Sequence, residues 1–249
     1  MAQGPPSFPP EPIPPDDLAK LLRLIVITDE ELASRHEKAG SSGRSGVEVV
    51  VETALAAGCR AIQLRMKGSG AREMLSAAAP LRRMTEEAGA LLFVNDRLDV
   101  ALAAGGDGVH LGPEDIPVAS ARAAVRKASS RPFLIGYSTD DPDDARRAVQ
   151  EGADYIGCGT VYPTGSKDDA GSVIGLEGLD EVARAVDVPV VGIGGITAER
   201  AIEVARTRAS GVAVISAVMG AEDPGAAVRR QLEPFGRRVP PSGSDPSPA

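Results

Sequence analysis

Residues 91–96 read LLFVND, a short apolar run that ends in the polar side chains Asn95 and Asp96. The pattern recurs at residues 108–115, where GVHLGPED carries a second apolar run into Asp115. Each run has the length of a strand and is followed by a segment with the apolar spacing of a helix. Strands that alternate with helices in this way predict parallel strands, whose polar carboxyl ends gather at one edge of a sheet.

Eight runs of this kind predict an α/β protein built from repeated βα units. They occupy residues 22–28, 61–66, 91–95, 108–111, 133–137, 155–158, 188–193 and 211–216. Eight units favour a closed (β/α)8 TIM barrel in one domain, with its active site at the carboxyl ends of the strands. An open doubly wound sheet fits the same order of elements, because counting strands does not show that a sheet closes.

The two ends of the chain differ from this repeat. Residues 1–20 are rich in proline and residues 236–249 in proline, serine and glycine, which predicts two disordered tails. The catalytic barrel is then expected over residues 21–235. Residues 1–17 carry no Lys or Arg and therefore lack the basic start of a signal peptide.

The composition restricts the class of partner. The 27 basic and 35 acidic residues give a net charge of −8, and only 3% of residues are aromatic. We therefore expect no nucleic-acid partner, and no run is long enough to cross a membrane. Cys59 and Cys158 each stand in an apolar run, as reduced core residues of a cytoplasmic protein do. Small-molecule substrates are expected, homo-oligomerisation is possible, and an anionic substrate needs local cations or a metal.

The second run ends in QLRMK at residues 63–67. Because side chains alternate across a strand, Gln63, Arg65 and Lys67 share one face, directed at the barrel axis, and the two apolar side chains between them face the helices. The alternative is an ordinary strand end with solvated cations.

The third and fourth runs end in oxygen ligands. Asn95, Asp96 and Asp115 offer what Mg²⁺ needs, because this ion takes one or two carboxylates together with waters and substrate phosphates. Either aspartate could instead cap a helix, and Asp99 and Glu114 are nearby alternatives of lower rank.

Hydroxyl groups follow the fifth run at Ser138 and Thr139, where they could bind a substrate heteroatom or form a turn. His110 lies in a strand pattern and is expected to be a hydrogen-bonded core residue rather than a base. No zinc-ligand set or Ser-His-Asp triad can be assembled.

Three loops favour phosphate binding. The loop after the sixth run, residues 157–167, carries Thr164, Ser166 and Lys167, although the two Asp residues that follow could neutralise the lysine in a solvated loop. Glycine-rich turns after the seventh and eighth runs, at residues 191–197 and 214–217, lie where barrels commonly bind phosphate.

Taken together, these motifs resemble the thiamine-phosphate synthase family in sequence and order. They are QLRMK, VND, HLGPED, IGYST, VYPTGSK, VGIGGIT and GVAVISA, and they extend from about residue 22 to 235. The resemblance implies that hydroxymethylpyrimidine diphosphate and a thiazole phosphate combine to give thiamine phosphate and pyrophosphate. It also implies that the diphosphate departs before the thiazole nitrogen attacks.

The resemblance also implies a role for each matching residue. Catalysis is assigned to Arg65, Ser138 and Lys167, with Ser138 orienting the pyrimidine, and magnesium to Asp96 and Asp115. Diphosphate binding is assigned to Arg65, Lys67, Asn95 and Lys167, with Gln63 as a further substrate contact. The thiazole phosphate is assigned to Thr164, Ser166, Gly195, Ile215 and Ser216.

Two other functions share part of this pattern. A thiazole tautomerase of related fold would keep the phosphate site but lose the diphosphate residues and carry a His near the end of the fifth strand. A non-catalytic sensor of a phosphorylated ligand would keep the binding residues. Residues 29–46 depart from the family as a long loop, which is either a lid at the catalytic rim or an insertion.

Overall fold

The computed structural model describes residues 12–37, 43–129, 131–164 and 172–236. Within these residues, parallel strands β1 to β8 form a closed barrel in the order of the chain. The strands are β1 Leu24–Ile27, β2 Ala61–Leu64, β3 Leu91–Asn95, β4 Gly108–Leu111, β5 Leu134–Ser138, β6 Tyr155–Cys158, β7 Val190–Ile193 and β8 Gly211–Val214. The predicted (β/α)8 barrel is confirmed, and the pairing of β1 with β8 excludes an open sheet.

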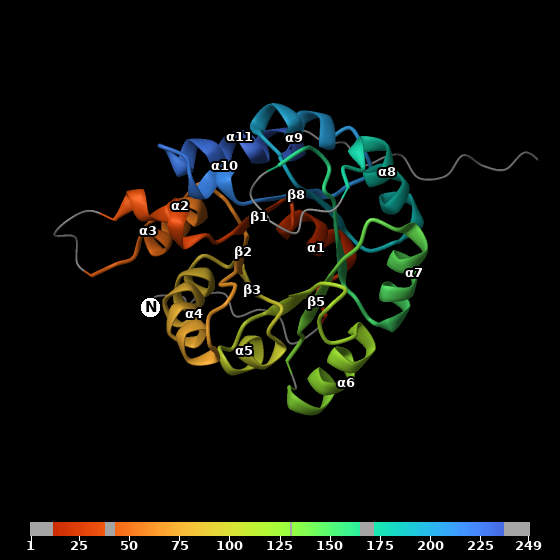
Figure 1. The fold of residues 1–249 in the computed structure, drawn as a ribbon, viewed down its shortest axis with the longest axis horizontal. Coiled ribbons are helices and arrows are strands. Elements are labelled where there is room, and N and C mark those ends of the chain that lie inside the picture. The colour runs from red at the N-terminus through yellow and green to blue at the C-terminus, as the bar shows by residue number, and fades with distance from the viewer. Residues whose placement is uncertain (1–11, 38–42, 130, 165–171, 237–249) are drawn as a thin grey trace, which may run out of the picture.

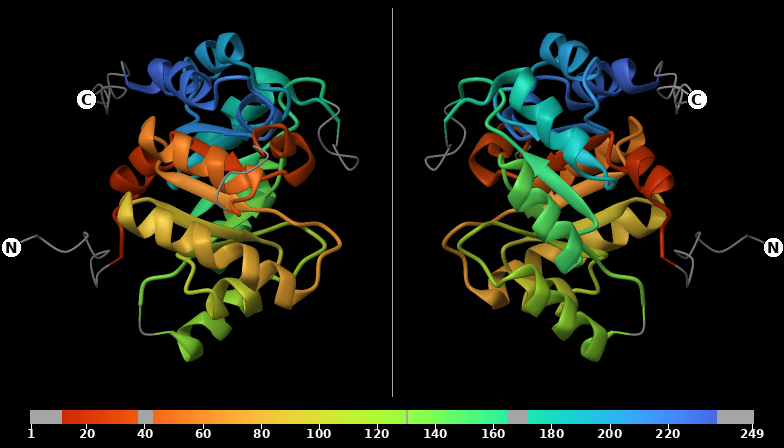
Figure 2. Two further views of the ribbon diagram at one scale, coloured as in Figure 1. Left: turned by 90° about the vertical axis from the view of Figure 1, so that its left-hand side faces the viewer. Right: turned by 90° about the vertical axis from the view of Figure 1, so that its right-hand side faces the viewer.

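Helices surround the strands as an outer ring, which Figure 1 shows along the barrel and Figure 2 from two sides. The ring consists of α2 Glu30–Ala33, the 3-10 helix η1 Ser34–His36, α3 Gly46–Ala56, α4 Ala71–Glu87, α5 Leu98–Ala103, α6 Val118–Ala128, α7 Pro142–Glu151, α8 Gly175–Ala185, α9 Ala198–Val204, α10 Ser216–Met219 and α11 Pro224–Gly236. Helix α1 Pro15–Leu21 lies inside this ring. None of these helices is long and apolar enough to span a bilayer.

Alternation along the strands divides the apolar residues into two cores. In β3, Leu91 and Phe93 point into the barrel, whereas Leu92 and Val94 pack against the helices. Burial of both faces explains why the strands read as continuous apolar runs rather than as alternating ones.

The inner core is closed at its amino end by α1. Leu18 of this helix is 2% exposed and joins the same cluster as Ile25 of β1 and Leu91 of β3. Helix α1 falls mostly within residues 1–20, which the sequence predicted to be a tail. That prediction is wrong for residues 15–20, because their proline at the first helical position starts a helix instead of preventing one.

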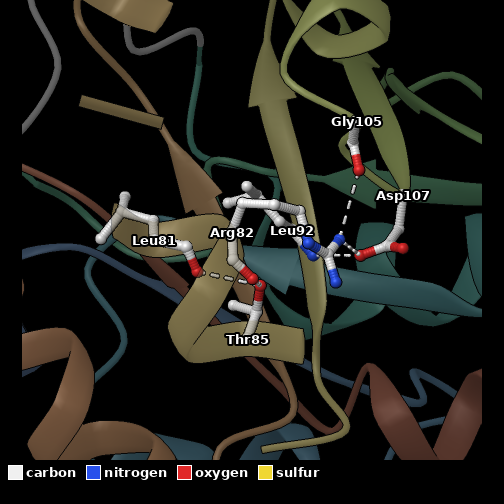
Figure 3. Close-up of polar contacts among 6 residues, drawn as sticks. All are labelled: Leu81, Arg82, Thr85, Leu92, Gly105 and Asp107. Atoms are coloured by element: carbon white, nitrogen blue, oxygen red, sulfur yellow. Dashed lines mark hydrogen bonds and ion pairs between the residues drawn. The ribbon is translucent and has the colours of Figure 1, made fainter. Parts of the chain in front are cut away.

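Ion pairs lock the amino ends of two strands. Asp107, just before β4, accepts a hydrogen bond from the Leu92 N–H of β3 at 2.8 Å and pairs with Arg82 of α4 (Figure 3). Asp154, just before β6, repeats the arrangement with the Ile135 N–H of β5 at 2.7 Å and Arg122 of α6. Each ion pair joins a helix to two neighbouring strands. Each Asp accepts from one charged donor, the guanidinium, and one neutral donor, the backbone N–H.

Candidate active site

A cavity of about 860 Å³ opens at the carboxyl ends of strands β2 to β8. Its walls include most of the predicted site residues that the structure describes: Arg65, Lys67, Asn95, Asp96, Asp115, Ser138, Thr164, Gly195, Ile215 and Ser216. Residues as distant in sequence as Arg65 and Ser216 therefore meet at one rim, as the barrel predicts.

The cations after β2 are held by a neighbouring strand end. The hydroxyl of Thr28, which is buried after β1, accepts a hydrogen bond from the Arg65 N–H at 2.9 Å. Arg65 and Lys67 line the cavity, while Leu64 and Met66 pack in the outer core. The predicted alternation is thus confirmed, and it gives this strand end two cations on the cavity side.

Gln63 lies deeper than the other residues of this motif. Its side chain is 3% exposed and belongs to the barrel interior rather than to the cavity wall. There it lies close enough to the phenol of Tyr155 to lower the pKa of that group. Direct contact of Gln63 with substrate remains a prediction.

Asp96 has an unusual backbone. Its φ is +62°, and it is the only non-glycine with positive φ in the described part of the chain. The Arg97 N–H donates to the Asn95 carbonyl at 2.7 Å, which closes a tight turn around Asp96, and the Asp96 N–H donates to the His110 carbonyl at 2.8 Å. The left-handed conformation costs about 1–2 kcal/mol in a residue with a side chain, and such strain concentrates at functional sites.

The Asp96 and Asp115 carboxyl groups lie together. The pKa of Asp96 is raised to about 6, first by burial and then by the charge of Asp115 and a hydrogen bond between the two groups. Lys67 and Arg65 are close enough to oppose this shift in the Asp96 pKa. The predicted carboxylate pair therefore faces the predicted cations across one cavity.

Neither aspartate caps a helix. Helix α5 begins after Arg97 and α6 after Pro117, and no side chain caps either helix. Asp115 instead accepts a hydrogen bond from the Gly112 N–H at 2.7 Å, which fixes its turn. The lower-ranked Asp99 is paired with Arg97 outside the cavity.

The donor set of this pair fits Mg²⁺. Burial and mutual repulsion of two carboxylates are relieved by a divalent cation, and Mg²⁺ takes one or two carboxylates with substrate phosphates completing its shell. Among the described residues, no group of three or more His, Cys, Asp or Glu is placed to hold a metal ion. The pair therefore fits an ion shared with substrate and not a closed structural site.

Ser138 reaches the cavity at the end of β5. Its Oγ lies 2.8 Å from Nε2 of His110, and the other ring nitrogen of His110 lies 2.9 Å from the hydroxyl of Tyr155. The expectation that His110 is hydrogen-bonded within a strand is confirmed, although its ring also lines the cavity.

The opposite side of the cavity is formed by the turns after β7 and β8. Gly195 has φ of +62°, and a Cβ atom there would lie 2.6 Å from the Pro163 carbonyl oxygen. Glycine is therefore required for the close approach of this turn to the loop after β6. Thr164, Ile215 and Ser216 line the same part of the cavity.

Arg200 is a cavity residue that the sequence did not suggest. It lies in the first turn of α9, donates to the Gly195 carbonyl at 2.5 Å, and stacks 4.5 Å from the ring centre of Tyr162. The available signal was its position three residues after Thr197, whose side chain caps α9 at the rim.

Comparisons with known proteins agree with this geometry. A family model described as thiamine monophosphate synthase matches residues 25–218. The chain belongs to the thiamine monophosphate synthase family. The resemblance found in the motifs is thus confirmed over the whole barrel apart from its first and last helices.

Relatives of this family align over most of their length. The thiamine-phosphate synthase of Moorella thermoacetica is 49% identical over 191 residues, which cover 77% of this chain and 89% of the relative. That of Pyrococcus furiosus is 46% identical over 207 residues, or 83% and 91% of the two chains. A solved structure of thiamine phosphate pyrophosphorylase from Pyrococcus furiosus has a TM-score of 0.75 at 43% identity, covering 88% of this chain and 98% of that one.

Two predicted family residues, Ser166 and Lys167, lie outside the described residues. Their assignment to phosphate and diphosphate, and that of Lys167 to catalysis, stay predictions.

Proposed function

We propose that this protein joins hydroxymethylpyrimidine diphosphate to hydroxyethylthiazole phosphate, releasing pyrophosphate and forming thiamine phosphate in thiamine biosynthesis. The observation that carries the proposal is the carboxylate pair Asp96 and Asp115, set opposite Arg65 and Lys67 in one cavity. A diphosphate needs both cations and a metal in a protein of net charge −8.

We assign the diphosphate to the end of the cavity formed by β2 to β4. Arg65 and Lys67 supply positive charge, Asn95 supplies an amide donor, and Lys167 is expected to join them. Asp96 and Asp115 would hold Mg²⁺, which would neutralise charge on the diphosphate when bound.

We assign the thiazole phosphate to the glycine-lined end. The turn at Gly195 allows the backbone to approach a phosphate closely, and Thr164 and Ser216 offer hydroxyl groups. Ser138 stands between the two ends and is assigned to the pyrimidine ring. The two substrates would then meet over the centre of the barrel.

The reaction requires one bond to break and one to form. The C–O bond between the pyrimidine methylene and the diphosphate breaks, and the diphosphate leaves with the bonding electron pair. The methylene cation that remains accepts the lone pair of the thiazole nitrogen, which forms the new C–N bond. Arg65 and Lys67 stabilise the charge that develops on the departing oxygen, and such fixed charges are commonly the largest catalytic term.

Pyrophosphate release tests the proposal directly. The full chain is incubated with both substrates, with each alone, and with both in the absence of Mg²⁺. A synthase releases pyrophosphate only when both substrates and the metal are present. Tight binding of a substrate without release would instead support the sensor function, and isomerisation of the thiazole phosphate alone would support a tautomerase.

A further inference from the structure

A chain of hydrogen bonds crosses the barrel interior beneath the cavity. It runs from the Tyr155 hydroxyl of β6 through the His110 ring of β4 to the Ser138 hydroxyl of β5, and the buried Gln63 side chain of β2 lies beside the Tyr155 phenol. The two hydrogen bonds of the His110 ring are 2.9 and 2.8 Å long, which are normal hydrogen-bond lengths. Three strands therefore supply the groups of these hydrogen bonds, which hold one hydroxyl group in place.

Two glycines in the barrel make room for the rings of Tyr155 and His110. A Cβ atom on Gly136 would lie 2.2 Å from the Tyr155 ring, and one on Gly157 would lie 2.9 Å from the His110 ring. Phe93 supports Tyr155 by an edge-to-face contact with ring centres 5.2 Å apart. Both rings are thus confined, so the geometry of the chain is fixed by packing as well as by its hydrogen bonds.

The direction of these hydrogen bonds depends on whether the Tyr155 phenol donates to His110. The neighbouring Gln63 side chain lowers the pKa of the Tyr155 phenol. Burial, the larger effect, raises the pKa of Tyr155 well above its usual range, so the phenol keeps its proton. A protonated Tyr155 can donate its O–H to Nδ1 of His110, and with that donation the His110 proton lies on Nε2, facing Ser138.

We infer that Tyr155 and His110 are positioning residues, which fix Ser138 so that its O–H points at a ring nitrogen of the bound pyrimidine. An Nε2–H that donates to the Ser138 oxygen occupies one of its lone pairs and leaves the hydroxyl hydrogen for the substrate. The reverse direction would leave Ser138 only a lone pair, which repels a ring nitrogen. This inference rests on the proposed function.

The Tyr155→Phe variant removes only the phenol oxygen and keeps the ring between Gly136 and Phe93. We expect its affinity for the pyrimidine diphosphate to fall about tenfold, the effect of one hydrogen bond. Its affinity for inorganic pyrophosphate with Mg²⁺, measured by calorimetry, is expected to be unchanged, because pyrophosphate has no ring. Equal losses for both ligands would overturn the inference.

Tyr137→Phe is the matched control. Tyr137 is the neighbour of Ser138 on β5, but it packs in the outer core and its phenol interacts with Asp144. This variant should leave both affinities unchanged. A thermal melt of each variant shows that both fold.

A double-mutant cycle tests whether Tyr155 acts through Ser138. Ser138→Ala alone should weaken pyrimidine diphosphate binding, and adding Tyr155→Phe should weaken it no further. Additive losses would mean that Tyr155 acts on the fold rather than through the hydroxyl.

The proton on His110 can be observed without any substrate. The chain has two histidines, so ring ¹⁵N spectra of the wild type and of His36→Gln assign the His110 signals. We expect a protonated Nε2 and an unprotonated Nδ1, and the opposite tautomer would overturn the inference. Because this measurement involves no turnover, its failure is distinct from failure of the proposed function, which wild-type pyrophosphate release tests.

Discussion

The barrel places a pair of aspartates at each of its two ends, and the pairs are treated in opposite ways. At the amino end, Asp107 (Figure 3) and Asp154 each accept hydrogen bonds from a backbone N–H and an Arg guanidinium. At the carboxyl end, Asp96 and Asp115 lie against one another, and Asp96 also has a left-handed backbone.

This difference separates residues that hold the fold from residues that prepare it for a ligand. Each amino-end carboxylate has an Arg partner within the protein, although burial still raises the pKa of Asp154. The carboxyl-end pair has unfavourable electrostatics that a divalent cation relieves. Residues held under strain at a site commonly lower stability while serving function.

The largest expected effect is the loss of turnover in Asp96→Asn. Asn removes one charged ligand but tolerates the left-handed backbone, so the fold is retained. We expect pyrophosphate release to fall by about 10³-fold or more, of the order seen when a group that stabilises developing charge is removed. Turnover at the wild-type rate with the same Mg²⁺ dependence would contradict the assignment.

Asp107→Asn should have the opposite phenotype. It leaves the Arg82 guanidinium without its charged partner in a place where the two side chains are 13% and 7% exposed. We expect the free energy of unfolding to fall by about 3 kcal/mol, as when one partner of a buried ion pair is removed. Urea unfolding measures this loss, and turnover at a temperature where the variant is folded should be near that of the wild type.

Asp154→Asn should give a smaller loss of stability. The Asp154 side chain is 33% exposed, so water can partly replace the carboxylate as a partner for the Arg122 guanidinium. We expect a decrease of about 1–2 kcal/mol in the free energy of unfolding, by comparison with buried pairs. A loss larger than that of Asp107→Asn would mean that solvent exposure does not determine how much each Asp–Arg pair contributes to stability.

The smallest expected effect is a pH dependence of stability without Mg²⁺. The native pKa of Asp96 is about 6 instead of 3.8, so the native state holds this proton more tightly than the unfolded state. The contribution of Asp96 to stability is therefore present below pH 3.8 and is lost as the pH rises to about 6. Above that pH, Asp96→Asn should be more stable than the wild type by about 1 kcal/mol, allowing for solvent screening.

Urea unfolding of both proteins across this pH range, with a chelator present, measures the difference. A gap that does not change with pH would show that the Asp96 charge carries no cost in the folded state. Addition of Mg²⁺ should stabilise the wild type more than the variant.

Much of the site could be predicted because it follows from short-range rules. Alternation in QLRMK sends Arg65 and Lys67 to one face, and the carboxyl ends of parallel strands meet, so Asp96 and Asp115 converge on them. The barrel itself could be predicted from its eight βα units, because helices that alternate with parallel strands cover the sheet they form.

What could not be predicted depends on long-range geometry. Closure requires the pairing of Ile25 with Ala213, which no local pattern encodes. The link from Tyr155 to His110 depends on how the strands are staggered around the barrel. Helix α1 was missed because its prolines suggested a tail. Its Leu18 is buried by residues of the inner barrel core that are distant in sequence, so no local pattern indicates its contact.

The pairing of β1 with β8 has a consequence for synthesis of the chain. Val26 cannot acquire its partner Val214 until β8 has also left the ribosome. Throughout translation, the first strand therefore has one edge of unpaired backbone groups, and such edges recruit other chains. Completion of the cylinder is the event that ends this exposure.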